Sequence, residues 1–199
     1  MKLSLAEFRA MNNPFRQALQ RGYEFPIFKS LGLADQPGDV LEIGCGSGYG
    51  AVLLASLHPR SYVGVYLMPE QIALARKRGL DDAQFLVSDA TDLSQISSES
   101  KDAVVIFGVL HHIPPWRKVI KECARILRPD GFFFLEEPDN SLINRWEKVF
   151  HWGHPGADLS LPALEACLTE NGFKITGRRR AFSFGHYSAQ KQIKVEGVL

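Results

Sequence analysis

Residues 40–48 read Val40-Leu41-Glu42-Ile43-Gly44-Cys45-Gly46-Ser47-Gly48, and this stretch decides the fold. Its apolar first half follows the turn residues Gln36-Pro37-Gly38, and its second half has glycine at every other position. Residues 49–57 then show a helical pattern. The stretch predicts a strand, a tight loop and a helix, and such a loop lets a ligand approach the backbone closely.

The rest of the chain alternates strand-like and helix-like segments. Further strands are expected at 62–67, 85–88, 103–107, 132–136, 173–176 and 181–188. Helices are expected to begin at Pro69, Pro115 and Ser160. Strands that alternate with helices predict a mainly parallel sheet, and the short link between the last two strands makes these two antiparallel. We therefore predict an α/β, Rossmann-like domain at 39–199, with a seven-stranded sheet, helices on both faces and an antiparallel last strand.

Residues 1–38 are expected to form a short helical N-terminal extension, or cap. Apolar residues recur there at helical spacing, and Asn13-Pro14 divides the run, because Asn favours a helix cap and Pro a first helical turn.

The composition narrows the class of protein. The chain has 199 residues, of which 45% are hydrophobic and 23% charged, which excludes a disordered or low-complexity chain. The three cysteines are odd in number and show no metal-ligand spacing, which favours a reducing, cytoplasmic location without disulfides or a metal. No segment resembles a membrane span or a signal peptide.

The formal net charge is +1, yet the C-terminal part is locally basic. Arg178-Arg179-Arg180 predicts either a nucleic-acid patch or a solvated strand whose middle arginine points away from the other two. We favour the solvated strand, because basic runs are common on ordinary protein surfaces.

The glycine spacing distinguishes two kinds of nucleotide site. A dinucleotide fingerprint, G-x-G-x-x-G, needs a third glycine at position 49, which is Tyr49, so the match is to G-x-G-x-G. With this loop, the chain resembles the class I S-adenosylmethionine-dependent methyltransferases, in particular the group with quinone-biosynthesis and other small-molecule enzymes. Three further motifs carry the resemblance: Ser88-Asp89-Ala90, residues 107–113 (FGVLHHI) and residues 127–131 (LRPDG).

The resemblance implies S-adenosylmethionine as the cofactor and methyl transfer to a small, partly apolar molecule. It also implies a set of cofactor-binding residues on the loop, after the second and third strands and after the fourth: Glu42, Gly44, Cys45, Gly46, Gly48, Tyr66, Leu67, Asp89, Ala90, Phe107 and Gly108. Asp89 is expected to accept from the adenine amino group, with an ordinary turn residue as the alternative.

Tyr66 departs from the family pattern. The family usually has Asp or Glu at the end of the second strand, where the carboxylate binds the ribose hydroxyls, whereas a phenol offers a weaker, neutral partner. Glu70 could compensate, although a solvated carboxylate at a helix start is the more common situation.

Catalysis needs no fixed triad in this family, because the sulfonium is already an activated methyl donor. His111 and His112 are the candidate catalytic bases, with packing or capping as the alternative for both. Phe150 and Trp152 are candidates to cover the substrate. His151 and His154 lack a third convincing ligand, so no metal is predicted.

Two rival functions remain open from the sequence: an RNA or other nucleic-acid methyltransferase, and a catalytically silent relative that keeps the fold for binding. The expected partner is a small-molecule substrate rather than nucleic acid, and the expected assembly is a monomer or a homodimer.

Overall fold

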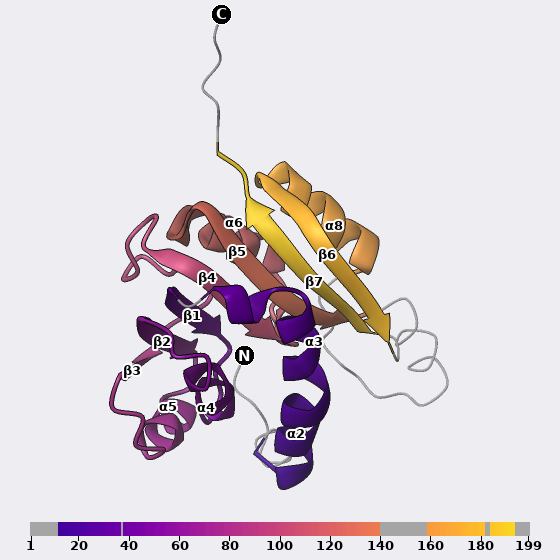
Figure 1. Ribbon diagram of the computed structural model, residues 1–199. Helices are drawn as coiled ribbons and strands as arrows, with labels where there is room; N and C mark the ends of the chain where they lie inside the picture. The colour runs from indigo at the N-terminus through magenta and orange to yellow at the C-terminus, as the bar shows by residue number, and fades with distance from the viewer. Residues whose placement is uncertain (1–11, 37, 140–158, 182–183, 194–199) are drawn as a thin grey trace, which may run out of the picture.

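The computed structural model describes residues 12–36, 38–139, 159–181 and 184–193. These residues form one seven-stranded sheet in the order β3-β2-β1-β4-β5-β7-β6 (Figure 1). The strands are β1 Asp39–Ile43, β2 Ser61–Tyr66, β3 Ala83–Val87, β4 Lys101–Phe107, β5 Leu127–Pro138, β6 Phe173–Ala181 and β7 Phe184–Lys191. The β1 strand pairs in parallel with β2 and β4, whereas β7 runs antiparallel to both β5 and β6. The predicted fold class is confirmed.

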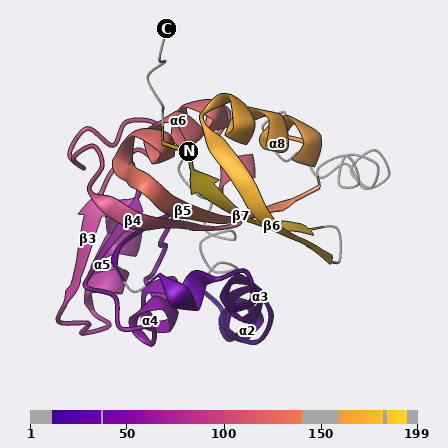
Figure 2. The same cartoon turned by 45° about the horizontal axis from the view of Figure 1, so that its top comes forward.

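The helices cover both faces of this sheet. They are α2 Pro14–Leu19, α3 Phe25–Ser30, α4 Tyr49–Ala55, α5 Pro69–Arg76, α6 Trp116–Ile126 and α8 Leu161–Glu170. Shorter turns are the π-helical η1 Gln20–Glu24 and the 3-10 turns η2 Leu33–Asp35 and η3 Leu110–His112. Figure 2 shows α6 and α8 on one side of the sheet and α2, α3 and α4 on the other.

Local sequence explains where the helices begin. The Asn13 side chain accepts a hydrogen bond from the Arg16 N–H at 2.8 Å, and the Ser160 hydroxyl accepts one from the Ala163 N–H at 3.3 Å. Each capping residue stands one or two positions before a proline, in the first turn where proline costs no hydrogen bond. The predicted helix starts at these two places are confirmed.

Two apolar clusters hold the layers together. One lies between the sheet and the α6 and α8 side, and the other lies under α3, α4 and α5. Phe25, Phe28 and Leu33 of the N-terminal part belong to the second cluster, and Phe28 packs against Phe107 with ring centroids 5.1 Å apart. The N-terminal helices are therefore anchored beside the end of β4.

The strand boundary near the C-terminus differs from the predicted one. The segment 181–188 was expected to form a single strand, but Ala181 ends β6 and Phe184 begins β7. The composition of residues 181–188 favours a strand throughout, so composition alone does not show where one strand ends and the next begins.

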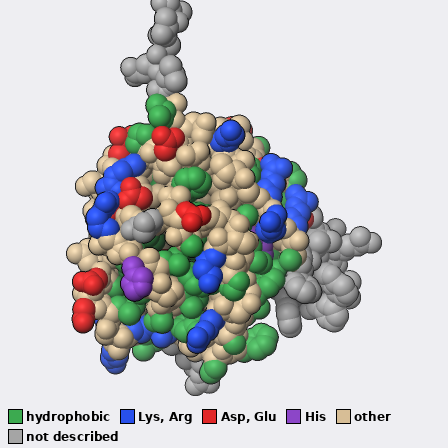
Figure 3. Space-filling model, in the orientation of Figure 1, with side chains coloured by type: hydrophobic (Ala, Val, Ile, Leu, Met, Phe, Trp, Pro, Cys, Tyr) green, Lys and Arg blue, Asp and Glu red, His purple; other side chains and the backbone are tan. Residues whose placement is uncertain are grey.

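The basic run Arg178-Arg179-Arg180 lies exposed on β6, which agrees with the solvated strand favoured from the sequence. Arg178 and Arg180 both pair with Glu165 of α8, at 2.9 and 3.7 Å. Strand alternation turns Arg179 toward the opposite face. Figure 3 shows a group of basic side chains at the right edge, where β6 lies. β6 is an outer strand of the described sheet, and charged side chains discourage edge-to-edge pairing there.

Candidate functional site

The glycine loop connects β1 to α4 in left-handed backbone. Gly44, Gly46 and Gly48 have φ angles of +82°, +51° and +79°, which favour glycine. A Cβ on Gly44 would lie 2.7 Å from a Val109 methyl, and one on Gly48 would lie 2.9 Å from the Ala75 Cβ. Two glycines are therefore required by packing within the protein. A Cβ on Gly46 would meet no atom of the described residues within 4 Å, so in this part of the structure the position faces open space.

A first cavity, of about 190 Å³, lies on one side of the loop at the carboxyl ends of the strands. Residues of the predicted set that line it are Gly44, Tyr66, Leu67, Asp89, Ala90 and His112. The other lining residues are Ile43, Val65, Ser88, Thr91, Val109, Ile113, Pro114 and Pro115. Mostly apolar walls with a carboxylate at one end suit a flat, heterocyclic ligand.

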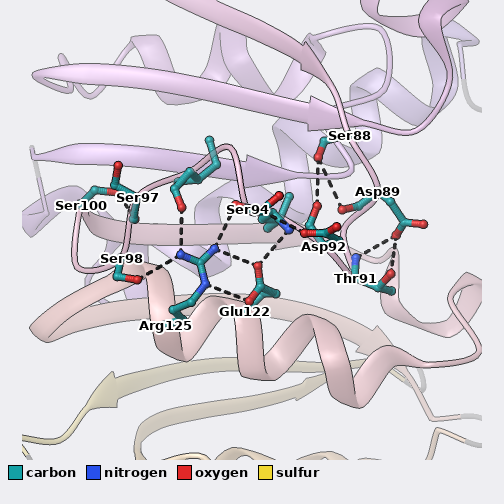
Figure 4. Close-up of polar contacts among 12 residues, drawn as sticks. Ser88, Asp89, Thr91, Asp92, Ser94, Ser97, Ser98, Ser100, Glu122 and Arg125 are labelled. Carbon is teal, nitrogen blue, oxygen red and sulfur yellow. Dashed lines mark hydrogen bonds and ion pairs between the residues drawn. The ribbon is translucent and has the colours of Figure 1, made fainter.

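The Asp89 carboxylate is held in a fixed turn at this cavity. Its Oδ1 accepts hydrogen bonds from the Thr91 N–H and the Thr91 hydroxyl, both at 2.8 Å. These bonds hold the pKa of Asp89 below its ordinary value, which keeps it an acceptor. Figure 4 shows that α6 supports the loop after β3: Arg125 donates to the Ile96 and Leu93 carbonyls, and Glu122 accepts from the Leu93 N–H.

A second cavity, of about 50 Å³, lies on the other side of the loop. Glu42, Cys45, Gly46 and Phe107 from the predicted set line it, and Gly44 and Val109 line both cavities. The remaining lining residues are Asn12, Arg16, Gln20, Ser47, Tyr49, Gly50 and Gln71. The N-terminal helix α2 thus brings a guanidinium to the glycine loop. This contribution was not foreseen, because docking of α2 is a tertiary contact that its own sequence pattern does not encode.

Gly48 and Gly108 line neither cavity. Gly48 begins α4 and packs on α5, and Gly108 has a φ of +61° and donates its N–H to the Glu136 carbonyl at 3.0 Å. Both shape the loops rather than the cavity walls. Burial raises the pKa of the Cys45 thiol, which keeps the thiol protonated.

Glu42 is a buried carboxyl group below the glycine loop. It accepts a hydrogen bond from the Tyr62 hydroxyl, and a Cβ on Gly50 would lie 2.1 Å from its Oε1. Burial raises the pKa of Glu42 to about 7. The group therefore ionises near neutral pH, and the carboxylate can then pair with a cation in the second cavity.

This pKa predicts a pH-dependent effect of Glu42→Gln on stability. The ordinary pKa of 4.5 applies to the unfolded chain, so the stability that Glu42 contributes is present below about pH 4.5 and is lost as the pH rises through 7. A neutral glutamine does not suffer this loss. Between pH 5 and pH 8, the free energy of unfolding of the variant should rise by about 2 kcal/mol relative to that of the wild type, as measured by urea unfolding. The exposed Glu170→Gln variant is the control, and an equal shift in both would contradict the assignment.

His111 and His112 lie in η3, directly after β4. The His111 Nδ1 lies 2.8 Å from Oε2 of Glu137, a residue on β5 that is fully buried. Glu137 also accepts hydrogen bonds from the N–H groups of Val109, Leu110 and His111 at 2.7–3.1 Å. A carboxylate accepts only, so the imidazole donates from Nδ1 and keeps Nε2 as an acceptor.

Glu137 is the most important residue that sequence reasoning missed. Glu136 and Glu137 are adjacent, and strand alternation places them on opposite faces, so the pattern does not show which carboxylate reaches η3. The His112 ring lies 3.9 Å from the His111 ring and lines the first cavity.

Phe150 and Trp152, the candidate substrate-covering residues, lie outside the described residues, as do His151 and His154. Within the described part of the chain, no group of three or more His, Cys, Asp or Glu side chains could hold a metal ion. In that same part, no helix is long and apolar enough to cross a membrane.

Comparison with known proteins identifies this arrangement. Residues 41–135, which run from β1 to β5, match the family described as "Methyltransferase domain". Residues 41–135 therefore form a methyltransferase domain of the class I S-adenosylmethionine-dependent type. The match covers the glycine loop, Asp89 and His111, and the cofactor of the domain is S-adenosylmethionine.

Two curated methyltransferases are similar in sequence. The chain is 40% identical over 114 residues to phthiotriol/phenolphthiotriol dimycocerosates methyltransferase of Mycobacterium tuberculosis, covering 54% of this chain and 41% of that protein. It is 33% identical over 122 residues to ubiquinone biosynthesis O-methyltransferase of Xanthomonas oryzae pv. oryzae, covering 60% of this chain and 48% of that protein. The chain thus matches less than half the length of either relative.

A solved structure shows the same fold over nearly the whole chain. It is a putative methyltransferase of Haloferax volcanii in complex with the Trm112 methyltransferase activator, with a TM-score of 0.76 and 20% identity. The superposition covers 94% of this chain and 98% of that one.

The two cavities beside the glycine loop fit S-adenosylmethionine. Gly46 leaves open the space that a Cβ would fill, so a ligand can lie against the loop backbone. The cavity beside Asp89 suits adenine. The second cavity offers the Arg16 guanidinium, which also pairs with Glu24, to the carboxylate of a methionyl group, and the Glu42 carboxyl group to its ammonium. Because Gly44 and Val109 line both, one extended ligand can occupy the two cavities together.

Proposed function

We propose that this methyltransferase transfers a methyl group from S-adenosylmethionine to a hydroxyl group of a small, partly apolar molecule. The observation that carries the hydroxyl assignment is the His111–Glu137 pair, in which a buried carboxylate orients an imidazole beside the cofactor cavities. When bound, the cofactor supplies a methyl group on sulfur with a neutral leaving group.

In this proposal the chain's own residues position the reactants and move one proton. The backbone at Gly44 to Gly46 holds the methionyl and ribosyl parts, Asp89 accepts from adenine, and Arg16 pairs with the carboxylate of the cofactor. His111 accepts the proton of the acceptor hydroxyl at Nε2, and Glu137 stabilises the resulting imidazolium through Nδ1. His112 serves as a wall of the cofactor cavity.

The class of acceptor is supported by the names of the relatives. The Xanthomonas relative is named as an O-methyltransferase of ubiquinone biosynthesis, and the mycobacterial relative as a methyltransferase of phthiotriol lipids. The pairing of Arg178 and Arg180 with Glu165 leaves the basic strand partly neutralised, which favours a small acceptor over nucleic acid.

A methyl-transfer assay tests this function. The protein is incubated with S-adenosylmethionine carrying a labelled methyl group and with phenols, apolar alcohols or bulk tRNA. We expect label in an alkali-stable ether of at least one hydroxyl compound. Label in tRNA alone would support the nucleic-acid alternative, and cofactor binding without any transfer would support the silent-relative alternative.

We also propose a cytoplasmic location, which the three cysteines support. Cys45, Cys123 and Cys167 are all buried as free thiols, a state that a reducing compartment maintains. The predicted monomer or homodimer is tested by sedimentation equilibrium.

A further inference from the structure

Gln71 is a buried amide with no partner among the residues that the structure describes. Its side chain is fully buried, yet within that part of the chain neither Oε1 nor Nε2 has a hydrogen-bond partner. Buried polar side chains are nearly always hydrogen-bonded, and an exception at a cavity indicates a missing ligand. Gln71 lines the second cavity together with Glu42 and Gly46.

The position of Gln71 on α5 explains why its amide faces the glycine loop. Gln71 and Ala75 are four residues apart, so they share one face of the helix. Ala75 packs against Gly48, and Arg78, two residues after the end of α5, donates to the Ser47 carbonyl. This face of α5 is therefore bound to the loop, and Gln71 stands where the face meets the cavity.

The cofactor presents a vicinal diol near this place. The ribose joins adenine to the methionyl group, so it lies between the two cavities, which meet at Gly44 and Val109. The usual carboxylate for the diol is absent, because Tyr66 ends β2. Glu70, the other candidate, is exposed and lines neither cavity.

We propose that the Gln71 side chain binds the ribose hydroxyls of S-adenosylmethionine in place of the missing acidic residue. A primary amide has one acceptor and one donor group, and each hydroxyl of a diol both donates and accepts. Ribose can therefore satisfy both unpartnered atoms at once: Oε1 accepts from one hydroxyl, and Nε2 donates to the other. The inference rests on the cofactor site of the proposed function and is independent of the methyl acceptor.

The test compares Gln71→Met with the wild type. Methionine has nearly the same length and shape without hydrogen-bonding groups, so its effect isolates the amide. By titration calorimetry, S-adenosylhomocysteine should bind the variant about ten- to a hundredfold more weakly. In the absence of ligand, the variant should melt no lower than the wild type, because no hydrogen bond of the free protein is lost. Glu70→Ala on the same helix is the control and should bind normally.

A ligand that lacks the diol makes the test specific. The 2′,3′-dideoxy analogue of S-adenosylhomocysteine should bind the wild type and Gln71→Met equally, because neither protein can form the ribose bonds. A penalty that persists with this analogue, or normal binding of S-adenosylhomocysteine by Gln71→Met, would overturn the inference while leaving the cofactor site intact. If Gln71→Met is misfolded by circular dichroism, Gln71→Ala takes its place with the same expectations. Failure of the wild type to bind S-adenosylhomocysteine would overturn both this inference and the proposed function.

Discussion

Gly46→Val is expected to lower the affinity for S-adenosylmethionine by about a hundredfold or more. Among the described residues no atom lies near a Cβ at this position, so the branched side chain fills the place of the cofactor rather than clashing with them. The cofactor would have to move away from the loop backbone and lose contacts along its whole length. Titration calorimetry with the folded variant measures the loss.

Gly79→Val is the matched control for backbone strain. Gly79 has a φ of +65°, a Cβ there would also meet no atom within 4 Å, and the residue lines neither cavity. Both variants therefore carry a similar cost for a branched residue in left-handed backbone. We expect Gly79→Val to melt lower, like Gly46→Val, and yet to bind the cofactor normally. Equal losses of affinity would show that strain, and not occupation of the site, causes the effect.

His111→Gln should lower kcat for a hydroxyl acceptor by about a hundred- to ten-thousandfold, the usual contribution of general base catalysis. The variant should keep its affinity for S-adenosylhomocysteine, because His111 lines neither cavity. His58→Asn, an exposed position with a φ of 53°, is the control, since asparagine tolerates that conformation. An unchanged kcat in His111→Gln would remove this residue from the chemistry.

Glu137→Gln should lower both stability and activity, because the carboxylate holds the turn after β4 and orients His111. A glutamine has a single oxygen for the donors that converge on Glu137, and its NH₂ group would face another N–H. The free energy of unfolding should fall by about 3 kcal/mol, because buried donors are left unpaired. Urea unfolding measures this, and kcat should fall as in His111→Gln. A fully stable variant would show that the turn after β4 does not depend on the carboxylate.

The sequence predicts the fold well, because the fold depends on local patterns. The alternating segments imply the parallel sheet, and the glycine spacing places the loop between β1 and α4, where Gly44 and Gly48 leave no room for a side chain. Arg16, Gln71 and Glu137 were missed for one shared physical reason. Each reaches the loops at the sheet edge only through tertiary packing of another helix or strand, and no periodicity of its own segment reports this.

The most direct test of the central claim is the binding of the cofactor itself. S-adenosylmethionine and S-adenosylhomocysteine should each raise the melting temperature of the wild type and give a saturable calorimetric titration, while NAD at the same concentration gives neither. Stabilisation grows with the ratio of ligand concentration to Kd, so millimolar ligand reveals even a weak site. A shift with NAD alone, or none with S-adenosylhomocysteine at millimolar concentration, would contradict the account.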